Sequence, residues 1–155
     1  MSNEIRLQPI GWVRAARKSA TDNGWDAVEA RIELDAARFG PEALKGLDQF
    51  SHVEVLFLFH RVEPGDIETG ARRPRGNPAW PEVGIFAQRG RNRPNRIGAT
   101  ICRILSVDGT TLHVQGLDAI DGTPVIDIKP CISGFAPRGT LREPAWVKEL
   151  MASYW

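Results

Sequence analysis

The 155-residue sequence is poor in cysteine and histidine and has no long apolar run. Its two cysteines, Cys102 and Cys131, form no CxxC pair, and the three histidines have no metal-ligand spacing with them. This argues against a disulfide framework and against a metal site. The longest apolar run, residues 55–59, is far shorter than the roughly 20 residues of a membrane-spanning helix, so no membrane partner is expected. The GxGxxG, Walker A and GxSxG signatures are also missing, which argues against a Rossmann-type cofactor fold.

The composition is that of a soluble globular protein. Apolar residues make up 42% and charged residues 25% of a chain long enough for one domain with its own core. We therefore expect a single domain over residues 1–155. The N-terminus lacks the apolar stretch of a signal peptide, and both cysteines are surrounded by apolar residues. Buried free thiols and a cytoplasmic location are the resulting predictions.

Lysine is scarce and arginine is abundant, with four and sixteen residues respectively. Seven arginines lie within residues 72–96, where Glu82 is the one acidic residue. Lysine would keep the protein soluble equally well, so solubility alone does not explain the preference for arginine. A guanidinium group, unlike an ammonium group, binds phosphate or carboxylate through two N–H groups or stacks on a base. Residues 72–96 therefore predict a binding region for a localised anionic partner. A solvated loop that keeps the protein soluble is the alternative.

Runs of β-forming residues predict a mainly β fold. Such runs occupy residues 7–13, 30–34, 52–59, 97–107, 111–114 and 124–128, with a short one from Val83. Asp108-Gly109, between two of these runs, predicts a hairpin. Helices are expected at residues 41–45 and 144–151. Strands of this number, joined mostly by short turns, predict a closed or nearly closed β-barrel with one or two peripheral helices.

Some individual side chains carry weaker signals. The longest loop, residues 63–81, is rich in glycine, proline and arginine, and such loops are functional or mobile. Trp25 and Trp80 lie in polar, loop-like surroundings and are the tryptophans best suited to stack on a base. His113 has no polar companions on its predicted strand and is expected to be structural.

Three motifs resemble one family. Residues 46–60, GLDQFSHVEVLFLFH, are similar to its GLxxFSH…LxFH strand. Residues 84–98, GIFAQRGRNRPNRIG, are similar to its GxFAxR…RPNxIG loop. Residues 117–130, LDAIDGTPVIDIKP, are similar to its LDxxDGTPVxDIKP segment. In this order and spacing, the chain resembles the TsaA-like domain of S-adenosylmethionine-dependent tRNA methyltransferases over about residues 5–140, with residues 141–155 left for the C-terminal helix.

The resemblance implies a β-barrel methyltransferase that binds S-adenosylmethionine without a Rossmann sheet. Its implied substrate is tRNA, N6-methylated at threonylcarbamoyladenosine beside the anticodon. It also implies a homodimer with the site near the subunit contact. By position, the implied cofactor-binding residues are Phe59, His60, Arg61, Phe86, Arg89, Leu117, Asp118, Ile120, Asp121, Gly122 and Thr123.

The chemistry of the cofactor suggests roles for some of these residues. Phe59 and Phe86 would supply apolar walls. Asp118 and Asp121 would accept hydrogen bonds from the ribose hydroxyls or the amino group, and Arg89 would hold the methionyl carboxylate through its fork. A plain turn is the alternative reading of residues 121–124.

The general base is not identified by the motifs. Asp127, Asp121, Lys129 and a phosphate of the substrate are all candidates. Asp127 and Lys129 alternate with isoleucines, so they share one strand face and either form a bracing ion pair or reach into the site. The residues expected to contact RNA are Arg72, Arg73, Arg75, Arg91, Arg93, Asn95 and Arg96.

Three positions depart from the family pattern. Arg61 stands where many members have Gln, Arg96 where they have Pro, and Cys131 where an aromatic residue is common. These departures affect the expected RNA substrate more than the cofactor. Two alternatives follow: a methyltransferase for a different or small acceptor, and a non-catalytic module that binds the cofactor or RNA.

Overall fold

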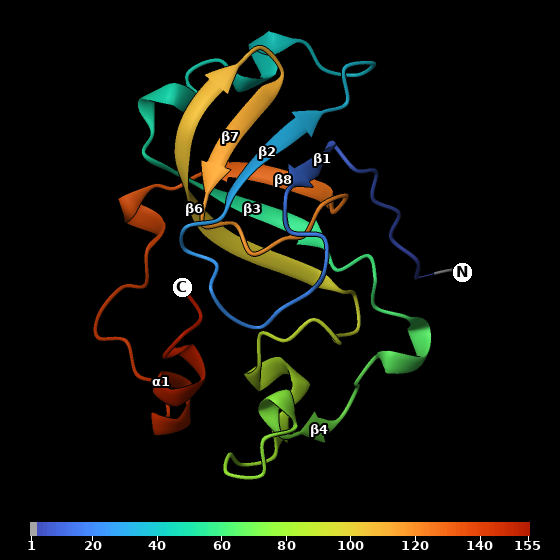
Figure 1. The fold of residues 1–155 in the computed structure, drawn as a ribbon, viewed down its shortest axis with the longest axis vertical. Coiled ribbons are helices and arrows are strands. Elements are labelled where there is room, and N and C mark those ends of the chain that lie inside the picture. Colours follow the sequence, from blue (N-terminus) through green and yellow to red (C-terminus); the bar gives the residue numbers. More distant parts are fainter. Residues whose placement is uncertain (1–2) are drawn as a thin grey trace.

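The computed structural model describes residues 3–155, so residues 1–2 of the predicted domain lie outside the described part. Within that part, six antiparallel strands close into a barrel (Figure 1). Around the barrel the order is β1, β2, β7, β6, β3 and β8, and β8 pairs with β1. The strands are β1 Gly11–Ala15, β2 Glu29–Leu34, β3 His52–Leu58, β6 Ile97–Asp108, β7 Thr111–Gln115 and β8 Pro124–Pro130. The prediction of a mainly β, closed barrel is confirmed.

The barrel core follows from period-2 alternation along the strands. On β3, Val53, Val55 and Phe57 point inward and are at most 2% exposed, while the residues between them are half-buried. Leu112 and Val114 on β7 are fully buried in the same way. Burying each such side chain stabilises the fold by about 1.5–3 kcal/mol relative to exposing it. The alternate outward positions of β3 hold polar and apolar residues alike, such as Glu54 and Leu56.

The predicted hairpin at Asp108-Gly109 is present between β6 and β7. Asp108 pairs with Thr111, and Gly109 has a φ of 60°, a left-handed conformation that glycine adopts without steric cost. The first strand, β1, begins later than the expected run at residues 7–13 and extends to Ala15. Leu7 is 58% exposed, and regular pairing begins only at Gly11, because Pro9 has no N–H to donate to a neighbouring strand.

Two short helical segments were expected. The α-helix α1, Ala145–Met151, confirms the C-terminal one, whereas the segment at 41–45 forms the 3-10 helix Pro41–Leu44. Residues 67–96 leave the barrel as an excursion with a two-stranded sheet, β4 Ala71–Arg72 and β5 Val83–Gly84 (Figure 1). The short strand expected from Val83 is β5, whereas its partner β4 does not stand out in the sequence. The remaining 3-10 helices are Leu47–Gln49, Pro64–Asp66, Pro74–Gly76, Ile85–Ala87 and Ser133–Phe135.

Three expectations about single side chains were wrong. Trp25 and Trp80 are only 3% and 7% exposed, so neither ring is available to stack on a base. Cys102 is buried on β6 as expected, but Cys131 is half-buried because it follows the last residue of β8, where the chain leaves the barrel.

Candidate functional site

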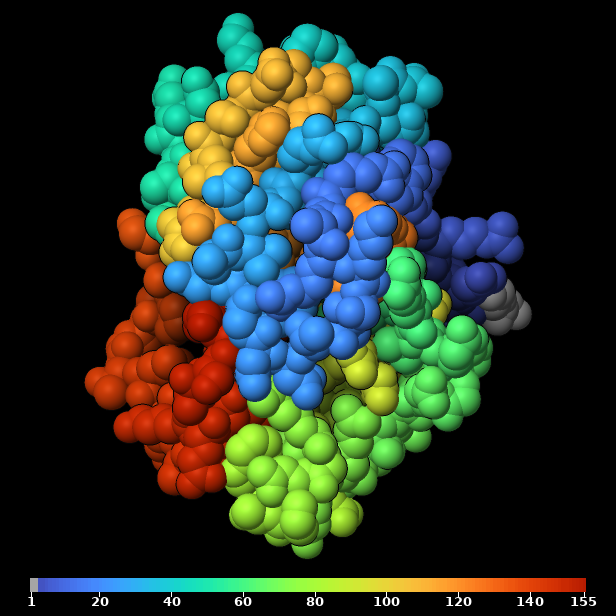
Figure 2. All heavy atoms as spheres, viewed as in Figure 1, coloured from blue at the N-terminus to red at the C-terminus, as the bar shows by residue number. Residues whose placement is uncertain are grey.

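One end of the barrel gathers segments that are far apart in the sequence. The 16–28 loop lies beside both the C-terminal residues and the 67–96 excursion (Figures 1 and 2). Asp121 N donates to Arg17 O at 2.8 Å, which ties the 117–123 loop to this 16–28 loop. Arg75 Nη2 donates to Asp22 O at 3.2 Å, which ties the excursion to it as well. Most of the sequence-predicted cofactor residues lie on these segments.

The 117–123 loop is held rigidly by its own buried side chains. Leu117, Ile120 and Thr123 are at most 8% exposed, and Thr123 Oγ1 donates to Ile120 O at 2.7 Å. These three residues therefore hold the loop rather than offer a side chain to a ligand. Gly122 has a φ of 82°, and its N–H donates to Val13 O at 2.8 Å. That conformation favours glycine and turns the loop back onto β1.

Two carboxylates project from this loop. Asp121 Oδ1 accepts a 3.0 Å hydrogen bond from Ala15 N at the end of β1, so Asp121 is partly committed to the fold. Asp118 accepts short hydrogen bonds from the Thr100 hydroxyl and from the Tyr154 hydroxyl. The sequence motifs indicate neither partner of Asp118. Thr100 and Tyr154 lie 18 and 36 residues away from it, with no motif that links them.

Burial near Asp118 changes the ionisation of its neighbours. Burial, followed by the charge of Asp118, raises the pKa of the Cys102 thiol to about 12. Burial also raises the pKa of the Tyr154 phenol, and the charge of Asp118 and its hydrogen bond act in the same direction. Arg75 and Arg89 act in the opposite direction on Tyr154, so both guanidinium groups lie within electrostatic range of the phenol.

The end of β3 brings Phe59, His60 and Arg61 to the same region. The Phe59 ring packs edge-on against Phe57 at 5.3 Å between centroids, so it is anchored to the core. Burial, and then the charge of Arg61, lowers the pKa of His60, which keeps its imidazole neutral at physiological pH. A methyl group built on Gly122 would lie 3.9 Å from His60 Nε2, so backbone and imidazole lie close together without a clash.

The excursion supplies Arg89 and Phe86. Arg89 Nη2 donates to Ala99 O at 2.6 Å, which fixes one arm of the guanidinium beside β6. The Phe86 ring is 78% exposed, so within one chain it does not form the expected pocket wall. The reason is local: Phe86 lies in the 3-10 helix Ile85–Ala87, whose buried side chain is Ile85.

The clustered arginines are used differently from one another. Arg73 donates to the carbonyls of Pro78 and Trp80, Arg93 to Gln88 O at 2.8 Å, and Arg96 to Val62 O at 2.9 Å. Irregular backbone leaves carbonyls without partners, and guanidinium forks satisfy them. Much of the cluster therefore braces its own loops, which the sequence alone did not reveal.

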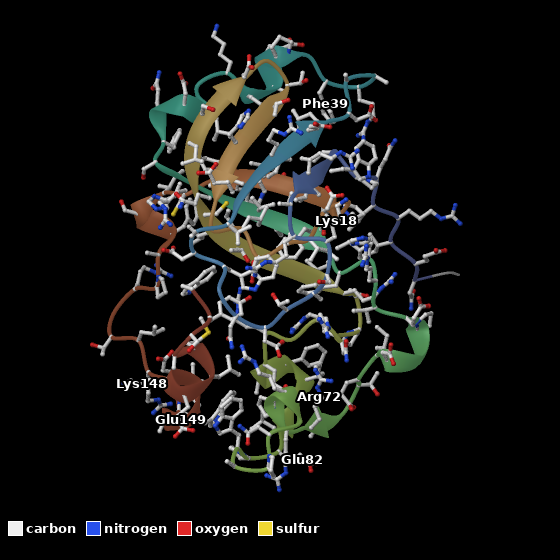
Figure 3. The ribbon with its side chains drawn as sticks, in the orientation of Figure 1. Lys18, Phe39, Arg72, Glu82, Lys148 and Glu149 are labelled. Atoms are coloured by element: carbon white, nitrogen blue, oxygen red, sulfur yellow. The ribbon has the colours of Figure 1, made fainter. Side chains whose placement is uncertain are left out.

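Other members of the predicted RNA-contacting set are more accessible. The side chains of Arg91 and Asn95 are exposed, and no hydrogen bond holds either side chain within residues 3–155. Arg72 is half-buried in the excursion (Figure 3), and its Nε is buried without a partner in the same described range. Arg91 and Asn95 are thus the members of the set that are free to meet a partner.

The remaining catalytic candidates lie elsewhere on the barrel. Lys129 Nζ and Asp127 Oδ2 form a 3.0 Å ion pair on the outer face of β8, and Asp127 Oδ1 also accepts from Ile128 N at 2.8 Å. Their side chains are 61% and 48% exposed. The bracing ion pair is therefore present, and a catalytic role for either residue stays a prediction.

A shallow groove of about 510 Å³ runs beside β1 and β2 and reaches Asp121. Its lining includes Arg14, Lys18, Arg31 and His113, and Lys18 is labelled in Figure 3. His113 pairs with Arg31 on the outside of the barrel, so the expectation that it has no polar companions was wrong. The groove carries both signs of charge and does not include Asp118.

Two features are absent from the described residues, a metal-binding cluster and a membrane-spanning helix. Among residues 3–155, no group of three or more His, Cys, Asp or Glu side chains is arranged to hold a metal ion. No helix in the same residues is long and apolar enough to cross a membrane.

The fold and the site together define a class of protein. It is a small closed antiparallel β-barrel that gathers carboxylate, imidazole and guanidinium groups around a glycine-bearing loop at one end. Such convergence of polar groups on a rigid scaffold is typical of a site for a small polar ligand.

Comparison with known proteins gives the family. Residues 17–136 match the family described as tRNA-methyltransferase O N-terminal domain, so the chain belongs to that family. A human protein named "tRNA (adenine(37)-N6)-methyltransferase" is 40% identical over 150 residues, which cover 92% of this chain and 34% of the human protein. A Methanothermobacter thermautotrophicus protein named "Probable S-adenosyl-L-methionine-binding protein" is 36% identical over 134 residues, 82% of this chain and 90% of that protein.

A solved structure agrees with the family. The structure titled "Crystal structure of TrmO from Pseudomonas aeruginosa" matches with a TM-score of 0.72 and 30% sequence identity. The match covers 90% of this chain and 61% of that chain. The chain thus spans about a third of the human relative and less than two thirds of this solved relative.

Proposed function

We propose that this chain is an S-adenosylmethionine-dependent methyltransferase that N6-methylates threonylcarbamoyladenosine next to the anticodon of tRNA. The observation that carries the proposal is the overlap between the family match and the polar end of the barrel. The matched residues 17–136 include His60, Arg89, Asp118 and Asp121. The names of the relatives point to the same cofactor and to adenine in tRNA.

The side chains fit the chemical parts of S-adenosylmethionine. Asp118 offers a partly buried carboxylate, and a carboxylate has about four acceptor sites, of which Thr100 and Tyr154 use two. Arg89 has N–H groups beyond the one that binds Ala99 O, as the methionyl carboxylate would require. A Cβ built on Gly122 would meet His60 Nε2 at 3.9 Å and nothing nearer apart from its chain neighbours, so the site allows close approach of a ligand to backbone.

Each residue has a distinct role in this proposal. Arg89 holds the carboxylate end of the cofactor, Asp118 accepts from the ribose hydroxyls, and Phe59 presents an apolar edge. When bound, the cofactor supplies a methyl group on a sulfonium, which is already activated for transfer. The protein's contribution is therefore mainly to position the acceptor nitrogen and to exclude water.

The acceptor N–H must also lose a proton. Asp121 is the best placed of the three candidates, because it shares a loop with Asp118, whereas Asp127 and Lys129 pair with each other on the outer face of β8. Asp121→Asn is a suitable variant, since the amide oxygen can still accept from Ala15 N while the charge and basicity are lost. We expect Asp121→Asn to lower kcat strongly with little change in melting temperature. Asp127→Asn should leave both kcat and the melting temperature nearly unchanged.

The proposed tRNA contacts fall on exposed groups. Arg91 and Asn95 are free to contact phosphates, while Arg73, Arg93 and Arg96 use N–H donors on carbonyls of the protein. Binding through phosphates weakens with salt. Affinity for tRNA should therefore fall steeply between low and physiological ionic strength.

A homodimer and a cytoplasmic location belong to the same proposal. Phe86 and Phe135 are 78% and 89% exposed, and aromatic side chains are enriched where subunits meet. A second copy of the chain would cover Phe86 and supply the wall that one chain lacks. Sedimentation equilibrium should give twice the chain mass of 17.2 kDa, and Phe86→Ser should shift it toward one chain mass. Free cysteines agree with a reducing compartment.

Transfer of labelled methyl groups tests the proposal. The purified protein is incubated with methyl-labelled S-adenosylmethionine and tRNA carrying threonylcarbamoyladenosine, and the matched control is the same tRNA without the threonylcarbamoyl group. We expect label in the modified tRNA alone. Equal labelling of both tRNAs would contradict the substrate, and labelling of neither would contradict the transfer.

One observation favours a second function. The Methanothermobacter relative, 36% identical over 134 residues, is named as a probable S-adenosyl-L-methionine-binding protein, and that name states no reaction. A module that binds the cofactor without transferring its methyl group would agree with this name, and so would a methyltransferase for a smaller acceptor. Tight cofactor binding without labelling of any tRNA would favour this alternative.

A further inference from the structure

The last residues of the chain cross the polar end of the barrel. We name residues 145–155, which comprise α1 and the four residues after it, the C-terminal strap. Its end pairs with the 16–28 loop: Gly24 N donates to Ser153 O at 3.1 Å, and Trp25 N donates to Tyr154 O at 2.9 Å. In Figure 1 the strap lies beside that loop. The strap lies beyond residue 136, where the family match ends.

A second attachment joins the strap to the excursion. Trp80 Nε1 donates to Glu149 Oε2 at 2.7 Å, and the rings of Trp80 and Trp146 lie 6.4 Å apart. Figure 3 shows Glu149 on α1 beside the excursion that carries Arg72. The strap is thus held at both ends, by a buried tryptophan on one side and by backbone pairing on the other. This fixes the direction from which Tyr154 enters the site.

Tyr154 meets Asp118 inside the barrel end. Its hydroxyl donates to Asp118 Oδ2, while the Thr100 hydroxyl donates to Oδ1. The two donors reach the carboxylate from different elements, β6 and the strap. A carboxylate held at both oxygens cannot rotate freely, and its unused lone pairs keep one direction. Arg75 and Arg89 are the other charged groups that act on the phenol.

We propose that Tyr154 is a positioning residue for the cofactor site: its hydroxyl, with that of Thr100, holds the Asp118 carboxylate in the one orientation that accepts the ribose hydroxyls. The inference rests on the proposed function, because it takes Asp118 to be a cofactor contact. It goes further by assigning a role to the strap and by making the C-terminal residues part of the binding site.

Calorimetric titration with S-adenosylmethionine tests the effect on binding. Tyr154→Phe removes only the hydroxyl and keeps the ring. A hydrogen bond to a charged group contributes about 1.5 kcal/mol or more, so we expect the Kd to rise by about tenfold. Lys148→Ala, an exposed change on α1, is the matched control and should leave the Kd unchanged. In an Asp118→Asn background, Tyr154→Phe should have almost no further effect, because its target is gone.

A second readout does not depend on the cofactor. Tyr154 is the single tyrosine in the chain, so the absorbance of tyrosinate reports its ionisation alone. In the native protein it should ionise well above the ordinary tyrosine pKa of 10.0, because of burial and the charge of Asp118. Asp118→Asn should lower the midpoint toward that ordinary value. A strap that merely packs against the barrel would show no such response.

The outcomes separate the two proposals. If the wild type binds the cofactor and Tyr154→Phe binds equally well, the positioning role is wrong while the proposed function stands. Tighter binding by Tyr154→Phe would also overturn it, since the phenol would then compete with the ligand for Asp118. If the folded wild type binds no cofactor, the proposed function fails and the positioning role fails with it.

Discussion

Gly98 lies where the barrel wall meets the aromatic end of β3. It pairs with Phe57 across β3 and β6, and a Cβ built on it would lie 2.6 Å from two ring carbons of Phe57 and 2.9 Å from Phe59 Cζ. Ordinary contact begins at 3.4 Å, and Phe57 is only 2% exposed, so its ring has little room to move. Overpacking costs about 1–3 kcal/mol, and replacing a strand glycine returns about 0.5–1 kcal/mol.

We therefore expect Gly98→Ala to lower the free energy of unfolding by about 1–2 kcal/mol and the melting temperature by about 2–8 °C. Gly84→Ala is the matched control, because its built Cβ meets nothing within 4 Å and its φ is −59°. Thermal and urea unfolding of both variants give the comparison. Since Phe59 precedes His60, Gly98→Ala should also weaken cofactor binding. A Gly98→Ala protein as stable as Gly84→Ala would refute the packing argued for this wall.

Three further predictions test other parts of the structure. Ellman's reagent should modify Cys131 in the native protein and Cys102 only on unfolding, because burial and a neighbouring carboxylate raise the pKa of the Cys102 thiol to about 12. Equal rates of modification of the two thiols would contradict the placement of β6. Acidification from about pH 7 to about pH 5 should destabilise the wild type more than His60→Asn. Burial lowers the pKa of His60 in the folded protein, so the unfolded chain binds the proton at a higher pH than the folded protein does. An equal fall in melting temperature for the two proteins would show that the imidazole is not buried. Arg91→Ala should reduce the slope of log affinity for tRNA against log salt concentration by about one, without changing the melting temperature. Arg96→Ala should lower the melting temperature, because it removes a hydrogen bond to Val62 O. The reverse pattern would mean that the two roles are exchanged.

The barrel could be predicted because alternation decides which face of a strand is buried. The runs at 30–34, 52–59 and 111–114 match β2, β3 and β7 within a residue at each end. The first strand could not be placed, because Leu7 and Ile10 look alike in sequence while only Ile10 N bonds to Val125 O. The short run at Val83 marks β5, but its partner β4 could not be predicted, because a strand of two residues shows no alternation.

The candidate site was predictable only where a motif names its residues. The motifs bring His60, Asp118 and Asp121 into view, but not the Thr100 and Tyr154 hydroxyls that bind Asp118. Those contacts depend on how the strap folds back over the barrel end. The arginine cluster shows the same limit, since composition cannot tell a guanidinium that binds a phosphate from one that binds a carbonyl of its own loop.

Calorimetric titration of the cofactor-free protein with S-adenosylmethionine tests the central claim most directly. The wild type should bind with micromolar affinity, Arg89→Ala should show no measurable heat of binding, and Arg91→Ala should bind like the wild type, with all three melting cooperatively. A folded wild type that gives no heat would contradict a cofactor site at this end of the barrel. Normal binding by Arg89→Ala would leave the cofactor in place but remove the role given to that guanidinium.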